Sequence, residues 1–200
     1  MRYNYITIER EYASGGSQIG ETLAKELGIA CYGKEILEEV ARENGTTPEQ
    51  IQDLEESANS SLLYSIAMAT KMMTGESSGI SQENALYLAE ARTIRRLSQQ
   101  GGCIFIGRCA RWVLKERPDV LNVYIHANLE FRKKRAIEYY GQRPDKIENL
   151  LKRYDKRRSN YYNANTGRKW DDRREYHLIL DSSKLGIGKC VKIIRSAFEA

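Results

Sequence analysis

A short run of glycine and serine residues near the start of the chain has the composition of a phosphate-binding loop. The run consists of Ser14, Gly15, Gly16 and Ser17. An alternating apolar segment at Tyr3–Glu9 precedes it, and an amphipathic stretch at Gln18–Leu27 follows it. A strand, a small-residue loop and a helix in this order direct several backbone N–H groups and a helix N-terminus toward one place. The sequence therefore predicts that a phosphate group binds the backbone of this run.

The cation that usually completes such a loop is not at its usual position. In the pattern G-x-x-x-x-G-K-[ST], the second glycine and the last position are matched by Gly15 and Ser17. Arg10 stands where the pattern has its first glycine, and Gly16 stands where the pattern has lysine. We expect the missing positive charge to come from Arg10, or from Lys34 after the second predicted strand.

A third cation, Arg108, follows the apolar segment Cys103–Ile106. Ligands of parallel α/β sheets bind at the carboxyl ends of the strands. Arg10, Lys34 and Arg108 each come directly after a predicted strand, so the pattern favours an anion site at one rim of the sheet. The alternative is that these cations are solvated side chains beside loops.

A second basic cluster lies in the segment Lys152–Arg158. At helical spacing Arg153 and Arg157 share one face, and Arg158 shares a face with Tyr162. A charge run of this kind can be an ordinary solvated face. In phosphoryl transfer, however, cationic stabilisation of the transferred group is a main source of rate, and arginines on a helical lid could supply it. The earlier basic run, Arg132–Arg135, is predicted to be an exposed helix face.

The composition indicates one soluble α/β domain. The chain has 200 residues, of which 41% are apolar, 30% are charged and three are proline, which suits a single sizeable core. Five strand-like segments alternate with helical ones, and this alternation favours a parallel sheet covered on both faces. The predicted strands are Tyr3–Glu9, Ile29–Tyr32, Cys103–Ile106, Val120–His126 and Tyr176–Leu180.

The helical segments are marked by caps and breakers. Ser17 and Asn128 are predicted N-terminal caps, and Gly28 is predicted to end the first helix. The other predicted helices are Lys34–Glu43, a capping-box helix from Thr47 to about Met73, Ser81–Gln100, an interrupted region from Arg132 to Asn165 with its break at Gly141–Pro144, and Gly188–Phe198. Met68, Met72 and Met73 form an apolar stripe that predicts either core or a homodimer face.

The net charge and the cysteines limit the partners and the compartment. The net charge of +5 suits a phosphate-rich small ligand and does not by itself predict a nucleic-acid partner. The four cysteines, at 31, 103, 109 and 190, show no C-x-x-C spacing and are expected to be reduced. No stretch reaches about 18 consecutive apolar residues, and the start of the chain lacks a signal peptide's apolar core. We therefore expect a cytoplasmic protein without a membrane span.

Four stretches of the chain resemble the cytidylate kinase-like family of P-loop nucleoside monophosphate kinases, in a variant that lacks the phosphate-loop lysine. The stretches are Ile6–Gly20, Ile104–Ala110, Arg153–Arg158 and Asp181–Gly186. The resemblance implies a three-layer α/β/α P-loop kinase fold in one domain over residues 1–200. It also implies a helical insertion at about 46–80, in place of the monophosphate-binding region, and a lid at about 141–170.

The same resemblance implies roles for individual residues. It makes Ser14 to Ser17 the phosphate loop, with Gln18 beside it, and places Ser17 where the family has a hydroxyl ligand of Mg²⁺. Arg108 matches the arginine that handles the acceptor phosphate, while Cys109 stands where cytidylate kinases have an aspartate. The family's lid arginines are matched by Arg153, Arg157 and Arg158.

Two functions from different classes follow from these observations. The first is a phosphotransferase that uses Mg²⁺ and a nucleoside triphosphate, expected to be ATP, with a nucleoside monophosphate or similar small phosphate as acceptor. The second is a regulatory nucleotide-binding protein with little turnover, which the missing lysine and Cys109 favour. A dinucleotide oxidoreductase is disfavoured, because Gly15, Gly16 and Gly20 do not fit G-x-G-x-x-G.

Overall fold

The computed structural model describes residues 2–49 and 82–200. The strands in this part of the chain are β1 (Tyr5–Arg10), β2 (Ala30–Tyr32), β3 (Cys103–Ile106), β4 (Val120–His126) and β5 (Leu178–Asp181). The helices are α1 (Gly16–Leu27), α2 (Glu35–Glu43), α5 (Gln82–Ser98), α6 (Ala110–Val113), α7 (Leu129–Glu138), α8 (Ile147–Thr166), α9 (Ser182–Leu185) and α10 (Ile187–Glu199). Short 3-10 helices lie at Pro144–Lys146 and Arg173–Glu175.

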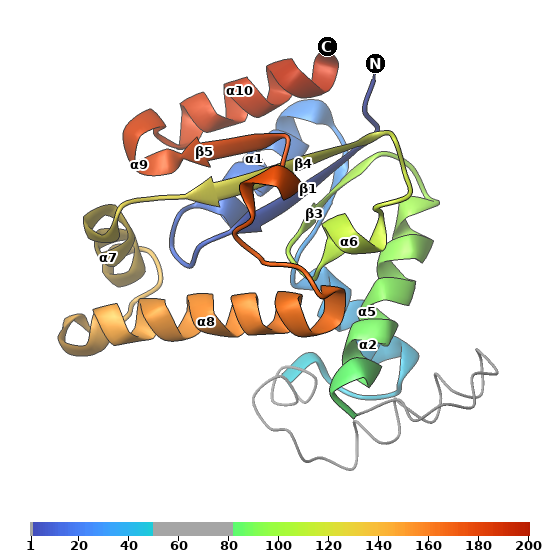
Figure 1. The fold of residues 1–200 in the computed structure, drawn as a ribbon, viewed down its shortest axis with the longest axis horizontal. Coiled ribbons are helices and arrows are strands. Elements are labelled where there is room, and N and C mark those ends of the chain that lie inside the picture. Colours follow the sequence, from blue (N-terminus) through green and yellow to red (C-terminus); the bar gives the residue numbers. More distant parts are fainter. Residues whose placement is uncertain (1, 50–81) are drawn as a thin grey trace. The chain divides into compact units, whose positions relative to one another are not determined.

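The strands form one five-stranded sheet in the order β2-β3-β1-β4-β5 (Figure 1). β1 pairs in parallel with β3 and with β4, and β4 pairs in parallel with β5. The predicted α/β class with a parallel sheet is confirmed. Because β1 is the central strand, its carboxyl end, where the glycine-serine run begins, lies in the middle of the rim at which ligands bind.

The two faces of β1 serve different purposes. Ile6 and Ile8 are completely buried and belong to a core cluster that also contains Ile19 and Leu23 of α1 and Ile194 of α10. α1 and α10 pack against each other as well as against the sheet (Figure 1). Side chains alternate along a strand, so Thr7 and Glu9 lie on the opposite face, where both are also buried. The strand therefore supplies core on one face and buried polar groups on the other.

The contacts of the chain divide it into two compact units. One unit comprises residues 1–31 and 101–200, and the other comprises residues 32–100. The first unit contains the glycine-serine run and the basic cluster of α8. In the second unit, α2 packs on α5, and Arg96 of α5 forms ion pairs with Glu39 and Glu43 of α2. The single domain stays a prediction, and most of the insertion, with its methionine stripe, lies outside the described residues.

Several predicted boundaries agree with the structure, and one cap is wrong. β3 and β4 have the predicted bounds, Asn128 caps α7 by accepting a hydrogen bond from the Phe131 N–H at 2.8 Å, and Gly28 ends α1 in the left-handed conformation. However, α1 begins at Gly16 and its cap residue is Gly15, which leaves Ser17 inside the first turn. Two glycines let the loop turn directly into the helix, so the helix starts earlier than serine capping predicts.

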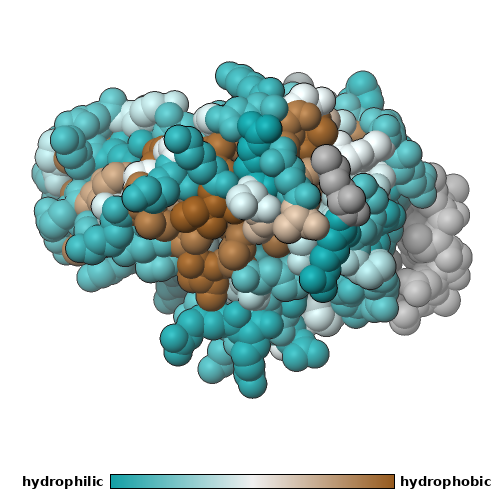
Figure 2. Space-filling view, turned by 90° about the horizontal axis from the view of Figure 1, so that it is seen from above, coloured by the Kyte–Doolittle hydropathy of each residue, from teal (hydrophilic) through white to brown (hydrophobic). Residues whose placement is uncertain are grey.

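The side of the molecule that carries α10 is mainly hydrophilic, with an apolar band among the polar residues (Figure 2). Partly buried apolar residues of the elements on this side, including Leu178, Leu185, Ile187 and Ile193, pack against the core. Among the residues that the structure describes, none of the helices has the length and apolar character that crossing a membrane requires.

Candidate functional site

The glycine-serine run forms a compact loop between β1 and α1. Ala13 has a φ of 59° and Gly15 a φ of 87°, so the backbone turns sharply twice before the helix begins. The Ser14 hydroxyl donates to the carbonyl oxygen of Glu11 at 2.8 Å, and the same carbonyl accepts from the Ser14 N–H at 3.3 Å. Ser14 is completely buried, and its side chain shapes the turn.

The start of α1 presents unpaired backbone donors. The first N–H groups of an α-helix have no partner within the helix. In the described part of the chain, the N–H groups of Gly15, Gly16, Ser17 and Gln18 also have no partner outside it. Four neighbouring donors at the positive end of a helix dipole form an anion-binding geometry. Phosphate binding at these donors stays a prediction.

The Arg10 side chain runs between two glycines. A Cβ placed on Gly16 would lie 2.5 Å from Cβ and 2.9 Å from Cγ of Arg10. A Cβ placed on Gly107, the residue after β3, would overlap Nη1 of Arg10. The absence of a side chain at these two positions gives Arg10 its path from the end of β1 across the start of α1 to the end of β3.

Arg10, Arg108 and Arg158 interact electrostatically with one another and with Glu9. Burial lowers the pKa of the Arg10 guanidinium, and attraction to Glu9 opposes that fall. Burial also lowers the pKa of Arg108, and it lowers the pKa of Arg158 to about 9. Nη1 of Arg158 donates to the carbonyl oxygen of Arg10 at 2.8 Å. The structure thus brings together the predicted cations of β1, of the β3 end and of α8.

Glu9 is the carboxylate of this cluster. Its side chain is buried on the face of β1 opposite α1, where Nε1 of Trp170 donates to Oε2 at 3.0 Å. Burial raises the pKa of Glu9, and attraction to Arg10, the Trp170 hydrogen bond and Arg158 oppose that rise. Glu9 was predicted to lie at the strand end, and no role was predicted for it. Trp170, which follows α8, was missed because its partner lies 161 positions away.

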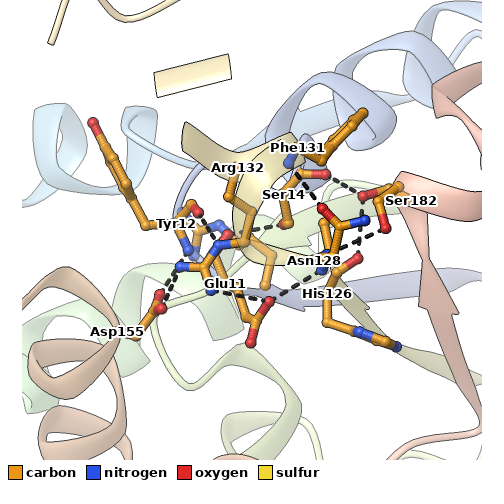
Figure 3. Close-up of polar contacts among 12 residues, drawn as sticks. Glu11, Tyr12, Ser14, His126, Asn128, Phe131, Arg132, Asp155 and Ser182 are labelled. Carbon is orange, nitrogen blue, oxygen red and sulfur yellow. Dashed lines mark hydrogen bonds and ion pairs between the residues drawn. The ribbon is translucent and has the colours of Figure 1, made fainter. Parts of the chain in front are cut away.

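The prediction that Arg132–Arg135 is only an exposed helix face is wrong. Arg132 of α7 is buried and forms ion pairs with Glu11 and with Asp155 of α8. Its Nε donates to the carbonyl oxygen of Tyr12 at 2.8 Å. Figure 3 shows the Arg132 guanidinium between the loop residues and Asp155.

Arg135 of the same run lies against the phosphate loop. Its Nη2 donates to Oε1 of Gln18 at 2.9 Å, and its Cζ would lie 3.6 Å from a Cβ placed on Gly15. Its Nε is buried and has no hydrogen-bond partner within residues 2–49 and 82–200. The loop is therefore flanked by a second arginine, in addition to Arg10, that the sequence did not reveal.

Aromatic rings and Asp155 hold α8 against the loop. The Tyr12 ring stacks on Tyr154 of α8 with centroids 4.2 Å apart, and it also lies 5.6 Å from Tyr140. Oδ1 of Asp155 accepts from the Tyr12 N–H at 2.7 Å. The structure therefore shows the predicted lid segment packed on the phosphate loop.

The predicted lid arginines differ in their surroundings. Arg158 belongs to the cluster with Arg10 and Arg108, and it is half-buried as Arg157 is, whereas Arg153 is exposed. The guanidinium carbons of Arg153 and Arg157 each lie 5.9 Å from the Tyr154 ring centroid. One of the three arginines thus lies at the site in this conformation, and the other two remain predicted lid residues. Lys34 is the cap residue of α2 and belongs to the second unit, so its role also remains a prediction.

The residues at the loop fit a Mg²⁺ ion that is held mainly by a nucleotide. Ser17 is partly exposed in the first turn of α1, and its hydroxyl has no partner among the described residues. Within the same part of the chain, no group of three or more histidine, cysteine or acidic residues is placed to hold a metal. Cys109 is buried at the position where the resemblance implied an aspartate. Mg²⁺ commonly takes few protein ligands and several phosphate and water oxygens, which matches this donor set.

The order of the strands and the loop between β1 and α1 indicate the class of protein. A parallel sheet of this order, with a phosphate loop between its central strand and α1, is a P-loop kinase fold. The family model described as the cytidylate kinase-like family matches residues 5–184. The chain therefore belongs to the cytidylate kinase-like family. Membership supports a nucleotide kinase-like function without naming a substrate.

Solved structures share the fold over nearly the whole chain. An uncharacterized protein from Eubacterium ventriosum has a TM-score of 0.73 and 22% identity, with 98% of each chain covered. The shikimate kinase of Acinetobacter baumannii, solved with shikimate, has a TM-score of 0.57 and 16% identity over 98% of this chain and 93% of that one. The shikimate kinase of Bacteroides thetaiotaomicron has a TM-score of 0.56 and 10% identity, with 98% of each chain covered. No curated protein sequence matches the chain.

Proposed function

We propose that the chain is a phosphotransferase that binds a nucleoside triphosphate, ATP in the first instance, together with Mg²⁺. It transfers the terminal phosphoryl group to a nucleoside monophosphate or a similar small phosphate. The observation that supports this proposal most is the cluster of Arg10, Arg108 and Arg158 beside the loop. Burial lowers the pKa of each of these arginines, so a phosphate anion at this place would offset a desolvation cost.

The residues divide between donor and acceptor. In this proposal the N–H groups of Gly15 to Gln18 bind the donor phosphates, with Arg10 and Arg135 on either side. Ser17 and the phosphate oxygens hold Mg²⁺, which neutralises phosphate charge when it is bound. Arg108 and Arg158 bind the acceptor phosphate, and Arg153 and Arg157 approach the transferred group from the lid.

The transfer needs no covalent protein intermediate. An acceptor phosphate oxygen forms a bond to the γ-phosphorus while the bond from that phosphorus to the β–γ bridging oxygen breaks, and the nucleoside diphosphate leaves with the electron pair. A dianionic phosphate carries no proton on the attacking oxygen, so no general base is required. Catalysis then consists of alignment and cationic stabilisation of the transferred group.

Titration and turnover together test the proposal. ATP, GTP, CTP and UTP would be titrated by calorimetry with and without Mg²⁺, and nucleoside diphosphate formation would be followed with a panel of nucleoside monophosphates and other small phosphates. We expect Mg²⁺-dependent binding and product formation that requires an acceptor. Arg158→Met should lower turnover on the order of a hundredfold, whereas Arg174→Met, at a side chain that is 88% exposed, should leave turnover unchanged.

The second candidate is a nucleotide-binding regulatory protein on the same fold. Buried Cys109 favours it, because a thiol replaces the carboxylate that the resemblance places near Mg²⁺. Tight nucleotide binding without product formation across the whole acceptor panel would favour this candidate. Failure to bind any nucleoside triphosphate would refute both functions.

A further inference from the structure

We propose that Arg10 and Gly16 have exchanged the roles that the phosphate-loop pattern gives to its first glycine and its lysine. The loop then receives its cation from the end of β1 instead of from the start of α1. This inference rests on the proposed function only in taking the phosphates of a triphosphate as the ligand of the loop.

The first support is the space between the two positions. With Arg10 present, a lysine at position 16 would have its Cβ only 2.5 Å from the Arg10 Cβ, which is closer than two side chains can approach. The stem of Arg10 therefore fills the place from which a lysine at position 16 would start. Arginine at position 10 and lysine at position 16 exclude each other, and removing the arginine side chain opens the space that a lysine needs.

The second support is the environment of the guanidinium. Nε of Arg10 is buried and has no hydrogen-bond partner in the described parts of the chain, and the same holds for Nε of Arg135 on the other side of the loop. The nearby carboxylate of Glu9 accepts a hydrogen bond from Trp170. Two other arginines of this unit are paired with carboxylates: Arg132 with Glu11 and Asp155, and Arg111 with Glu175. Arg10 is a partly buried cation without such a pair, and a phosphate would be a fitting partner for it.

The third support is that the path of Arg10 is fixed. Its backbone carbonyl accepts a hydrogen bond from Arg158, and its side chain passes the bare backbone of Gly16 and Gly107. A preorganised guanidinium loses little entropy when it binds, and its planar fork can contact two phosphate oxygens at once. A lysine ammonium at the usual position acts as a point charge.

An exchange can be tested by reversing it. Inorganic tripolyphosphate and MgATP would each be titrated by calorimetry against the full chain. Arg10→Met and Arg10→Lys have stems of similar length and differ in charge. We expect Arg10→Met to raise the Kd for tripolyphosphate about ten- to a hundredfold, and Arg10→Lys to stay within about tenfold of the wild type. Arg195→Met removes a half-exposed arginine of α10 and is the control.

The decisive variants are the two single replacements and their combination. Arg10→Gly should weaken tripolyphosphate binding as Arg10→Met does, and Gly16→Lys alone should not tighten it, because Arg10 occupies the space. The double variant Arg10→Gly/Gly16→Lys should return to within about threefold of the wild type. Melting temperatures measured without ligand show whether each variant is folded. If a glycine variant is unfolded, the comparison of Arg10→Met with Arg10→Lys decides the question.

The outcomes separate this inference from the proposed function. Equal affinity of Arg10→Met and the wild type, a double variant no better than Arg10→Gly, or a wild type that does not bind tripolyphosphate would each overturn the exchange. An affinity loss in Lys34→Ala that the Arg10 variants do not show would assign the cation to Lys34 and would also overturn it. A wild type that binds tripolyphosphate through Arg10 but transfers no phosphoryl group would refute the kinase function and leave the exchange intact.

Discussion

A single hydroxyl fastens the phosphate loop to the far end of the chain. Ser182 is completely buried, and its Oγ lies 2.5 Å from the carbonyl oxygen of Ser14 and 3.1 Å from that of His126. These contacts connect the loop with β4 and α9 (Figure 3). The resemblance identified this region only as part of a shared stretch, because nothing in the spacing of Ser14 and Ser182 shows that they meet.

Replacing this hydroxyl should lower the stability of the protein. We expect Ser182→Ala to lower the free energy of unfolding by about 1–3 kcal/mol, because a buried carbonyl would lose its donor. Urea denaturation measures this loss. Ser196→Ala, on the exposed side of α10, should stay within about 0.5 kcal/mol. If the two variants behave alike, the hydroxyl does not hold the loop.

Glu9 should give the protein a characteristic dependence of stability on pH. Burial raises the pKa of Glu9 above the value of 4.5 that the unfolded chain has. Between these two values the folded chain holds a proton that the unfolded chain has lost, so this group's contribution to the free energy of unfolding falls as the pH rises. The free energy of unfolding of the wild type, measured relative to that of Glu9→Gln, should therefore be lower at pH 7 than at pH 5.

Urea denaturation of both proteins at pH 5 and pH 7 measures this difference. Glu116→Gln is the control, since the Glu116 side chain is 91% exposed, and its stability should follow that of the wild type at both pH values. A difference between wild type and Glu9→Gln that is the same at the two pH values, or that reverses, would show that burial does not raise the pKa of Glu9.

One carboxylate, that of Asp155, connects helix α8 both to the phosphate loop and to α7. Asp155 accepts from the Tyr12 N–H and pairs with Arg132, whose side chain is 8% exposed. Of the acidic residues among the lid arginines, Asp155 is thus committed to α7 and to the loop. The guanidinium carbons of Arg153 and Arg157 lie near the ring of Tyr154, which stacks on Tyr12 of the loop.

Removing this carboxylate's charge should loosen the lid. We expect Asp155→Asn to lower the free energy of unfolding by about 1.5–3 kcal/mol, because Arg132 would lose a charged partner. Hydrogen exchange of the ligand-free protein should speed up at residues 11–14 and 150–165. Asp145→Asn, in the 3-10 helix before α8, removes a half-exposed partner of Arg143 and should change stability by less than about 0.5 kcal/mol. Unchanged exchange at 150–165 in Asp155→Asn would contradict this account.

Nucleotide binding should act on the same element in the opposite direction. Binding of MgATP is expected to slow hydrogen exchange at residues 150–165, because the lid arginines find phosphate partners there. β1 is already buried at the centre of the sheet and should change little. Protection confined to residues 10–20 would indicate phosphate binding without closure and would favour the regulatory function.

The secondary-structure elements whose bounds were best predicted are those in which all residues have the same polarity. Cys103–Ile106 is wholly apolar and is buried on both faces of the sheet, so its bounds could be predicted. Helix α7 shows the opposite case. The basic run that begins at Arg132 is typical of a solvated helix face, yet Arg132 is buried. Its burial depends on Glu11 and Asp155, which lie far away in the sequence, and pairings of this kind leave no local pattern.

At the scale of the whole molecule, the fold and the site were predictable to different degrees. Hydrophobic alternation and glycine punctuation determine the order of strands and helices, and the parallel sheet follows from that order. The glycine-serine loop between β1 and α1 was predictable for the same reason, since it is a local motif. The path of Arg10 past Gly16 and Gly107 was not, because it depends on how the ends of β1, α1 and β3 meet.

The separation of core and rim predicts that stability and binding can be changed independently. The core lies between the sheet, α1 and α10, on the face of β1 that Ile6 and Ile8 occupy. The candidate site lies at the carboxyl ends of the strands. A cavity in the core should therefore weaken the whole unit without altering the affinity of the molecules that remain folded.

Two adjacent isoleucines of α10 allow a test of whether stability and affinity change independently. Ile194 is completely buried, and its neighbour Ile193 is partly buried against the same core. We expect Ile194→Ala to lower the free energy of unfolding by about 2–5 kcal/mol and Ile193→Ala by less than half as much. Urea denaturation measures both losses. Titration with MgATP under native conditions should give both variants a Kd within about threefold of the wild type. A much larger rise in Kd for Ile194→Ala would show that packing of α10 also shapes the phosphate loop.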